Sequence, residues 1–420
     1  MAVGSPPLED PPAGGGIALS GGGRTFPMNS VSQEPAAPVL VVAGEASGDM
    51  YAAELVQALG TRMSASGPAF FGCGGPALRK AGMEILVDNR QLSVLGPFEA
   101  VSHLGRFFAA LRQLEAAARQ RKPRWAILVD FPDFNLPLAR RLKRQGVGVF
   151  YFISPQIWAW RKRRVHALRR WVDGMIVILP FEEEFYRRYG MQVEYVGHPL
   201  VDRVKTSCSR AQFLPSLGLA EDRLTISLLP GSRSREIRFN LPAMARTARR
   251  LQREQPAQFL VPLASPSHAP LVRGLIRDEA PGLSVALVEN DTYDAVGHSD
   301  LAVVSSGTAT LEAALLGTPL IAVFRISIPS WIVGQYLIDV PYYSLVNLIA
   351  GREIISELYQ QDFTEDRLYA EIRKLLTESG RSARARMALS GVRERLGQGG
   401  AISRAAERIA SWMEAGPKGE

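Results

Sequence analysis

The chain has 420 residues, of which 46% are hydrophobic, and this length exceeds one compact core and suggests two domains of about 200 residues each. The formal net charge of +8 favours anionic partners such as phosphates, nucleic acid or acidic lipid headgroups. The only two cysteines, Cys73 and Cys208, lie far apart, which excludes a disulfide framework and a cysteine-based metal site and fits a reducing compartment.

Residues 1–36 are rich in Gly, Pro, Ser and Ala and contain no apolar segment of signal-peptide length. We therefore expect a disordered N-terminal extension, with Met28 as an alternative start of the protein. No later segment reaches the roughly 20 uninterrupted apolar residues of a membrane span.

Past the extension, short apolar runs alternate with helical patterns, which is typical of parallel sheets with crossover helices. The first series of predicted strands covers 39–43, 69–72, 125–129, 149–153, 174–178 and 193–196. The second series covers 225–229, 258–262, 284–288, 301–304 and 320–323, and the turn-rich stretch 197–219 predicts a linker between them. We expect an α/β protein whose two doubly wound, Rossmann-like domains face each other across a ligand-binding cleft.

The predicted domain boundaries follow from this division. The N-terminal acceptor domain covers 37–200 and the C-terminal donor domain covers 201–384. A helix near 385–415 is a candidate to pack back onto the first domain.

The first predicted strand leads into Gly44-Glu45-Ala46-Ser47-Gly48-Asp49. Its glycines let a ligand approach the backbone closely, whereas Ser47 or Asp49 also suits a helix cap. A second glycine-rich loop, 72–77, fits the dinucleotide fingerprint G-x-G-x-x-A only loosely because Pro76 stands where the helix should begin. This departure argues against a dehydrogenase.

Asp130 is the strongest acid–base candidate, since it ends the strand 125–129 and precedes Phe131 and Phe134. Desolvation beside these rings would raise its pKa and suit it to act as a general base. We expect Asp133 to cap the helix that begins near Asn135. The intervening proline and the lack of further clustered ligands disfavour a metal site made from the two aspartates.

The segment 154–164 places Trp158 and Trp160 beside the consecutive cations Arg161, Lys162, Arg163 and Arg164. Aromatic rings interleaved with cations suit a membrane–water interface, and they equally suit stacked bases of single-stranded nucleic acid. A solvated helix face with buried tryptophans would have the same pattern. His198, in the linker, is predicted to be a hydrogen-bonded histidine rather than a catalytic one.

Two strand-to-helix corners in the second half suit phosphate. The run 305–312 leads from a strand into an Ala/Leu-rich helix, so backbone N–H groups gather at a helix N-terminus, and Glu312 lies one turn further in, where it could bind ribose hydroxyls. The other corner, 230–236, carries Arg233, whose planar guanidinium can bind a diphosphate through paired hydrogen bonds. Purely structural turns remain the competing interpretation of both corners.

Taken in order, these motifs resemble the lipid-A-disaccharide synthase family of glycosyltransferases. The resemblance runs from about residue 38 to the C-terminus, and Val346 stands where the family usually has proline before Asn347. It rests on AGEASGD (43–49), DFPDFN (130–135), SPQIWAWRKRRV (154–165), LPFE (179–182), GHPLVD (197–202), LPGSR (229–233), SGTATLE (306–312) and NLIAGRE (347–353).

The resemblance implies a glycosyltransferase of the B type. It would join UDP-2,3-diacylglucosamine to 2,3-diacylglucosamine 1-phosphate through a β-1,6 bond and release UDP, with inversion and with no cofactor or obligatory metal. Its place would be the inner face of the inner membrane of a Gram-negative bacterium, on an anionic surface that the segment with Trp158, Trp160 and the four cations would contact. The residues implied are Asp130 as base, Arg233, Ser306, Gly307, Thr308, Glu312, Asn347 and Arg352 for the donor, and Glu45, Ser47 and Asp49 for the acceptor.

Two alternatives stay open at this point. One is a transferase or epimerase that uses UDP-N-acetylglucosamine without acyl chains. A diacylated substrate would instead need an apolar groove, which the apolar stripe of residues 95–114 could line, although core packing would produce the same stripe. The other is a basic nucleic-acid-binding protein, which the resemblance disfavours. Binding of UDP but not of an oligonucleotide would separate them.

Overall fold

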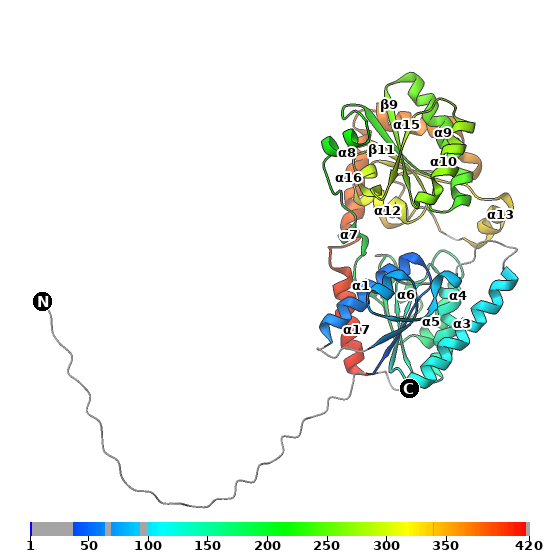
Figure 1. The fold of residues 1–420 in the computed structure, drawn as a ribbon, viewed down its shortest axis with the longest axis vertical. Helices are drawn as coiled ribbons and strands as arrows, with labels where there is room; N and C mark the ends of the chain where they lie inside the picture. Colours follow the sequence, from blue (N-terminus) through cyan, green and yellow to red (C-terminus); the bar gives the residue numbers. More distant parts are fainter. Residues whose placement is uncertain (2–36, 64–68, 93–99, 339, 417–420) are drawn as a thin grey trace, which may run out of the picture. The chain divides into compact units, whose positions relative to one another are not determined.

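The computed structural model describes Met1 and residues 37–63, 69–92, 100–338 and 340–416 (Figure 1). The predicted extension therefore lies outside the described residues except for Met1, as does the beginning of the apolar stripe 95–114. Within the described part, the strands form two sheets in which every pair is parallel. This confirms the predicted α/β class with two doubly wound sheets, whereas the cleft between them stays a prediction.

The first sheet has the strand order β3-β2-β1-β4-β5-β6-β7. Its strands are β1 (Val39–Ala43), β2 (Phe70–Gly74), β3 (Glu84–Asp88), β4 (Trp125–Val129), β5 (Gly148–Phe152), β6 (Gly174–Val177) and β7 (Glu194–Tyr195). The accompanying helices are α1 (Ala46–Arg62), α2 (Pro76–Lys80), α3 (Ala100–Arg121), α4 (Pro132–Lys143), α5 (Val165–Trp171), α6 (Glu182–Arg188) and α7 (Leu200–Arg203). The order reverses between β1 and β4, which is where open α/β sheets bind ligands.

The second sheet has the order β10-β9-β8-β11-β12-β13 and reverses between β8 and β11. Its strands are β8 (Leu224–Leu229), β9 (Ala257–Leu263), β10 (Val285–Glu289), β11 (Leu301–Ser305), β12 (Leu320–Phe324) and β13 (Ser356–Tyr359). The remaining helices are α8 (Arg210–Ser216), α9 (Ser234–Glu254), α10 (Ala269–Glu279), α11 (Thr292–Gly297), α12 (Thr308–Leu315), α13 (Ile328–Leu337), α14 (Leu345–Ala350), α15 (Glu365–Thr377), α16 (Arg381–Arg395) and α17 (Ala401–Ala415).

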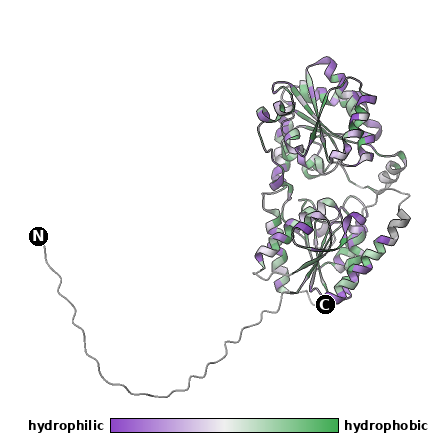
Figure 2. Cartoon of the chain, in the orientation of Figure 1, coloured by the Kyte–Doolittle hydropathy of each residue, from purple (hydrophilic) through white to green (hydrophobic). Residues whose placement is uncertain are grey.

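The central strands are apolar throughout because both of their faces are buried. In β1, Val39 and Val41 pack with α1 and α17 on one face, while Leu40 and Val42 pack with α3 and α4 on the other. The second sheet repeats this arrangement, with α9, α10 and α15 on one face and α12 and α16 on the other. Figure 2 shows the strands as mostly apolar, whereas the helices also carry hydrophilic residues.

The C-terminal helix α17 contacts α1 and β6, although it follows the elements of the second sheet along the chain. The Trp412 ring stacks on Phe150 of β5 with centroids 5.3 Å apart, and Arg62 of α1 donates to the hydroxyl of Ser403. The last helix thus completes the layer that covers one face of the first sheet.

Two strands and two helices depart from the sequence prediction. The strands β3 and β13 were not predicted; both lie at sheet edges, where strands are less buried and their apolar signal is weaker. The predicted linker 197–219 contains α7 and α8, and α8 begins with a capping box formed by Ser209 and Gln212.

Candidate functional site

The first candidate corner for ligand binding lies where the order of the first sheet reverses. The loop after β1 begins at Gly44, where a side chain would collide with the ring of Phe131 in the loop after β4. Glycine therefore lets the two loops pack together, and this brings Glu45 close enough for its charge to act on Asp130. The sequence predicted both loops but not this contact.

Asp130 has an unusual backbone that is held on several sides. Its φ is 44° and that of Phe131 is 46°, a left-handed conformation that is rare for residues other than glycine. The Asp130 carbonyl accepts hydrogen bonds from Asn135 Nδ2 at 2.7 Å and from the Tyr151 hydroxyl, while its N–H donates to the carbonyl of Phe152 at 3.2 Å. These bonds hold the main chain of Asp130 in its left-handed conformation, as the surroundings of a strained residue must.

The carboxyl group of Asp130 is suited to accept a proton near neutral pH. Burial raises its pKa from 3.8 to about 7, and the nearby negative charge of Glu45 contributes to the increase. A base with a pKa near the working pH combines the right protonation state with useful basicity. Strongly shifted pKa values gather at functional sites, so the raised pKa of Asp130 supports its predicted role.

The other acidic side chains near this corner have different partners. Asp133 does not cap a helix as predicted: α4 begins at Pro132, and the Asp133 carboxylate pairs with Arg161 at 3.0 Å and with Arg164. Asp49 is buried and accepts hydrogen bonds from the N–H groups of Gly75 at 2.6 Å and of Ala77 at 2.9 Å.

Asp49 therefore caps α2 rather than its own helix. Both of its oxygens are used in this contact. Glu45 and Ser47 are exposed at the start of α1, so their place on the acceptor side stays a prediction.

The tryptophan-containing segment is only partly a surface. Trp158 is buried, its Nε1 donates to Glu182 at 3.2 Å, and its ring packs edge-on against Phe181. The predicted membrane contact is therefore wrong for Trp158, because its ring fills the core. Trp160 is half-buried beneath the guanidinium of Arg161 at 4.2 Å, whereas Arg163 is exposed.

Glu182 is a buried carboxylate that sequence reasoning did not single out. It accepts hydrogen bonds from the N–H groups of Leu179 at 3.0 Å and Ile178 at 3.3 Å, besides that of Trp158. Burial raises its pKa to about 7. The available signal was its position directly after the apolar stretch that follows β6, because the first of the three glutamates 182–184 adjoins buried residues, where a carboxylate must be paired or hydrogen-bonded.

The second candidate corner for ligand binding lies where the order of the second sheet reverses. The helix α12 begins after Gly307, whose φ of 149° suits glycine, and no side chain caps this described N-terminus. Thr308 is therefore not the cap that a structural turn would have used. The first N–H groups of α12 remain available for an anion, which the positive end of the helix dipole favours.

Arg233 follows β8, the strand beside β11, and Glu312 lies within α12 itself. The side chain of Arg233 is 74% exposed and its Nη1 pairs with Glu236 at 2.9 Å, so it can exchange this partner for a phosphate. Glu312 accepts a hydrogen bond from the Tyr293 hydroxyl at 3.2 Å, and burial raises the pKa of its carboxyl group. Tyr293 was absent from the predicted site.

A buried asparagine of α9 joins the three loops of this corner. Asn240 Nδ2 donates to the carbonyl of Pro230 at 2.9 Å and to the Ser305 hydroxyl at 3.2 Å, and its Oδ1 accepts from the N–H of Arg325 at 3.0 Å. These partners follow or end β8, β11 and β12. One amide thus sets the spacing of the loops that precede Arg233 and α12.

The remaining predicted donor residues have unequal positions. The amide of the buried Asn347 bonds to the carbonyl of Ile355 at 3.0 Å, to Glu357 at 2.8 Å and to the N–H of Ile354 at 2.8 Å. These bonds hold the turn before β13, so the side chain has a structural task of its own. Ser306 donates to the carbonyl of Tyr343 at 3.5 Å, and Arg352 is exposed.

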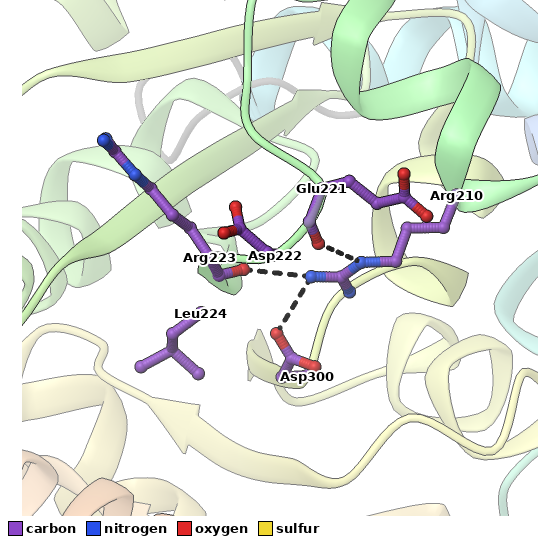
Figure 3. A pocket seen from close by; sticks show the side chains of 6 residues that line it. All are labelled: Arg210, Glu221, Asp222, Arg223, Leu224 and Asp300. Carbon is purple, nitrogen blue, oxygen red and sulfur yellow. Dashed lines mark hydrogen bonds and ion pairs between the residues drawn. The ribbon is translucent and has the colours of Figure 1, made fainter.

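Two further groups of polar side chains have structural roles. The first lines a hollow of about 440 Å³ at the amino end of β8, opposite the edge that carries the candidate donor loops (Figure 3). There Arg210 pairs with Asp300 and donates hydrogen bonds to the carbonyls of Glu221 and Arg223.

The second group is formed by Cys208, Asp294 and His298, whose ligand atoms lie within 4.8 Å of one another. Asp294 accepts hydrogen bonds from the N–H of Ser207 at 2.8 Å and of Cys208 at 3.2 Å, and His298 Nε2 lies 2.8 Å from the Cys208 carbonyl. These bonds tie the segment before α8 to α11.

Comparison with known proteins decides between the open interpretations. The model of the family described as lipid-A-disaccharide synthetase matches residues 39–411. The chain belongs to the lipid-A-disaccharide synthetase family. A lipid-A-disaccharide synthase of Myxococcus xanthus is 45% identical over 90% of this chain and 98% of its own length, and that of Solibacter usitatus is 42% identical over 90% and 97%.

Solved structures of other proteins share the fold of this family member. The S. aureus MnaA protein, solved with UDP, superposes with a TM-score of 0.63 at 13% identity over 91% of this chain and 98% of its own. The calicheamicin glycosyltransferase CalG4 gives a TM-score of 0.57 at 14% identity over 91% and 99%. At such identities the likeness establishes the two-sheet architecture alone.

Proposed function

We propose that the chain is an inverting glycosyltransferase that joins UDP-2,3-diacylglucosamine to 2,3-diacylglucosamine 1-phosphate through a β-1,6 bond and releases UDP. Relatives named lipid-A-disaccharide synthase support a disaccharide-forming reaction on lipid A precursors. The observation that carries the chemistry is Asp130, a carboxylate at the reversal of the first sheet whose pKa is raised to about 7.

In the proposed reaction, the Asp130 carboxylate removes the proton from the 6-hydroxyl of the acceptor. The oxygen forms a bond to the anomeric carbon of the donor while the bond from that carbon to the diphosphate oxygen breaks, and its electron pair leaves with UDP. One displacement converts the α-linked donor into a β-linked product, so no covalent enzyme intermediate is needed.

The donor corner would neutralise the charge that develops on the leaving diphosphate. Arg233 would bind it through paired hydrogen bonds, and the uncapped N-terminus of α12 would bind it through the backbone N–H groups of Gly307 and Thr308, with Ser306 beside them. Fixed donors of this kind stabilise transition-state charge without reorganising. The proposal therefore assigns no role to a metal or cofactor.

On the donor side Glu312, held by Tyr293, would accept the ribose hydroxyls. Arg352 is exposed and available for the donor, and Asn347 would act by shaping the turn before β13. Glu45 and Ser47 would line the acceptor side.

The proposed place of work is a membrane surface. Among the described residues, no helix has the length and apolar character needed to cross a bilayer. We propose peripheral attachment to the inner face of the inner membrane, where the segment from Trp160 to Arg164 would meet anionic headgroups at about 1 kcal/mol for each cation engaged. Arg161 and Arg164 already pair with Asp133, so Arg163 is the best placed of these cations.

Nucleic acid is not among the proposed partners. Base stacking needs accessible rings, and Trp158 is buried while Trp160 is covered by Arg161. Tight binding of an oligonucleotide in competition with UDP would contradict this part of the proposal.

A transfer assay tests the proposed function. The wild-type protein should transfer diacylated glucosamine from its UDP derivative and should use unacylated UDP-glucosamine poorly. The matched variant Asp130→Asn should bind UDP normally and lose about 100-fold or more in kcat. Equal use of acylated and unacylated donors would refute the substrate, and more than about a tenth of the wild-type kcat in the variant would refute the base.

A further inference from the structure

Large hydrophobic side chains are exposed mainly in one segment of the described chain. Of the seven such residues in the described part, four lie between 328 and 343: Ile328, Ile332, Ile338 and Tyr343. The exposed fractions are 73% for Ile328 and 49% for Ile332. These two belong to α13 and are four residues apart, so they share one face of the helix.

The sequence of α13 contains no charged residue, which is unusual for an exposed helix. The helix also carries Trp331, the neighbour of Ile332 along the chain, and the rings of Trp331 and Tyr343 have centroids 5.8 Å apart. Aliphatic side chains beside Trp and Tyr are typical of the boundary between hydrocarbon and headgroups.

The segment also adjoins the donor corner. The helix α13 follows β12 after three residues, and the carbonyl of Tyr343 accepts the hydrogen bond from Ser306, which directly precedes Gly307. The apolar face is therefore attached to the same edge of the second sheet as the phosphate-binding helix start.

We propose that the exposed face of α13 is a membrane contact that inserts into the lipid surface and seats the donor corner there. This deepens the proposed function and rests on it, because only an acylated substrate requires the donor corner to work at a lipid surface. Ten residues of helix span about 15 Å, half of a hydrocarbon core of about 30 Å, so α13 lies in the interface and does not cross it. A partner recognised through charge would find none on this helix.

The two membrane contacts respond differently to salt. Attraction of the cations Arg161 to Arg164 to anionic lipid weakens as ions screen it, whereas insertion of Ile328 and Ile332 does not depend on charge. Binding to neutral phosphatidylcholine vesicles in about 1 M salt, where the screening length is about 3 Å, therefore isolates the contribution of α13.

The test compares the full-length wild-type chain with Ile328→Ser/Ile332→Ser by sedimentation with such vesicles. The control is Met387→Ser, which removes an equally exposed apolar side chain (74%) from α16. We expect the double variant to bind about tenfold or more weakly, and the control to bind like the wild type. Both variants should keep wild-type transfer activity on substrates in detergent micelles.

Three results would overturn the proposal. The first is equal sedimentation of the double variant and the wild type in high salt, and the second is no sedimentation of the wild type with neutral vesicles. The third is a wild-type dimer that the double variant abolishes, because a second copy of the chain would then cover this face of α13. Absence of wild-type transfer activity in micelles would instead refute the proposed function, so the two failures are distinguishable.

Discussion

Replacing the proposed base should make the first domain more stable at alkaline pH. The pKa of Asp130 is about 7 in the folded protein and 3.8 in an ordinary environment, so between these values the folded state binds more protons than the unfolded state. Stability therefore falls as the pH rises from about 4 to about 7. Asp130→Asn removes this penalty, keeps the side-chain size and tolerates the left-handed backbone at φ 44°.

The size of the effect follows from the two pKa values. At 1.36 kcal/mol for each tenfold change, the interval from 3.8 to about 7 sets an upper limit of about 4 kcal/mol. Asp130 is only partly buried, so solvent screening reduces this, and we expect a stabilisation of about 1 to 3 kcal/mol at pH 8 and little difference at pH 4.

Urea unfolding followed by tryptophan fluorescence measures this difference. Five of the six tryptophans, all except Trp331, belong to the first sheet and its helices or loops, so the signal reports mainly on that domain. The difference between variant and wild type should grow with pH and level off above about pH 8. A difference that is constant with pH, or a variant that is less stable at pH 8, would refute the raised pKa.

Three further predictions concern turnover and donor binding. The wild-type kcat/KM should fall tenfold for each pH unit below about 7 as Asp130 becomes protonated, and a plateau down to pH 5 would argue against this base. Arg233→Ala should weaken UDP binding measured by calorimetry, and Arg233→Lys should restore little of this binding because a point charge lacks paired donors. Equal affinities of the wild-type protein for UDP and uridine would contradict a diphosphate contact. Asn240→Leu should leave three loop groups without a hydrogen-bond partner and so lower the free energy of unfolding by about 2 to 4 kcal/mol. It should also raise the KM for the donor and leave the KM for the acceptor unchanged. An unaltered donor KM would limit Asn240 to a packing role.

The features predicted well from the sequence are those set by local pattern. Continuous apolar runs such as Val39–Ala43 indicated strands buried on both faces, and loops following these strands located Asp130 and the start of α12. The edge strands β3 and β13 escaped because their residues are partly exposed and their apolar pattern is weak.

The features missed are those set by hydrogen bonds between distant segments. Asp49 binds N–H groups 26 to 29 residues away, and Asn240 reaches Arg325 across 85 residues, so neither partner follows from a local motif. Trp158 was misplaced for the same reason. Its neighbouring cations suggested a surface, whereas its hydrogen bond to Glu182, 24 residues later, draws the ring inward.

The left-handed backbone around the proposed base has a consequence for protein engineering. Asp130, Phe131 and Ile153 have φ values of 44°, 46° and 63° at the ends of two neighbouring strands, and each such residue costs about 1 to 2 kcal/mol relative to glycine. Glycine at position 131 or 153 would relieve strain and loosen the backbone that positions the Asp130 carboxylate, and glycine at position 130 would remove the proposed base itself. A library selected for heat resistance alone would therefore accumulate substitutions at this corner and lose activity, so thermostable variants should be sought with these three positions held constant.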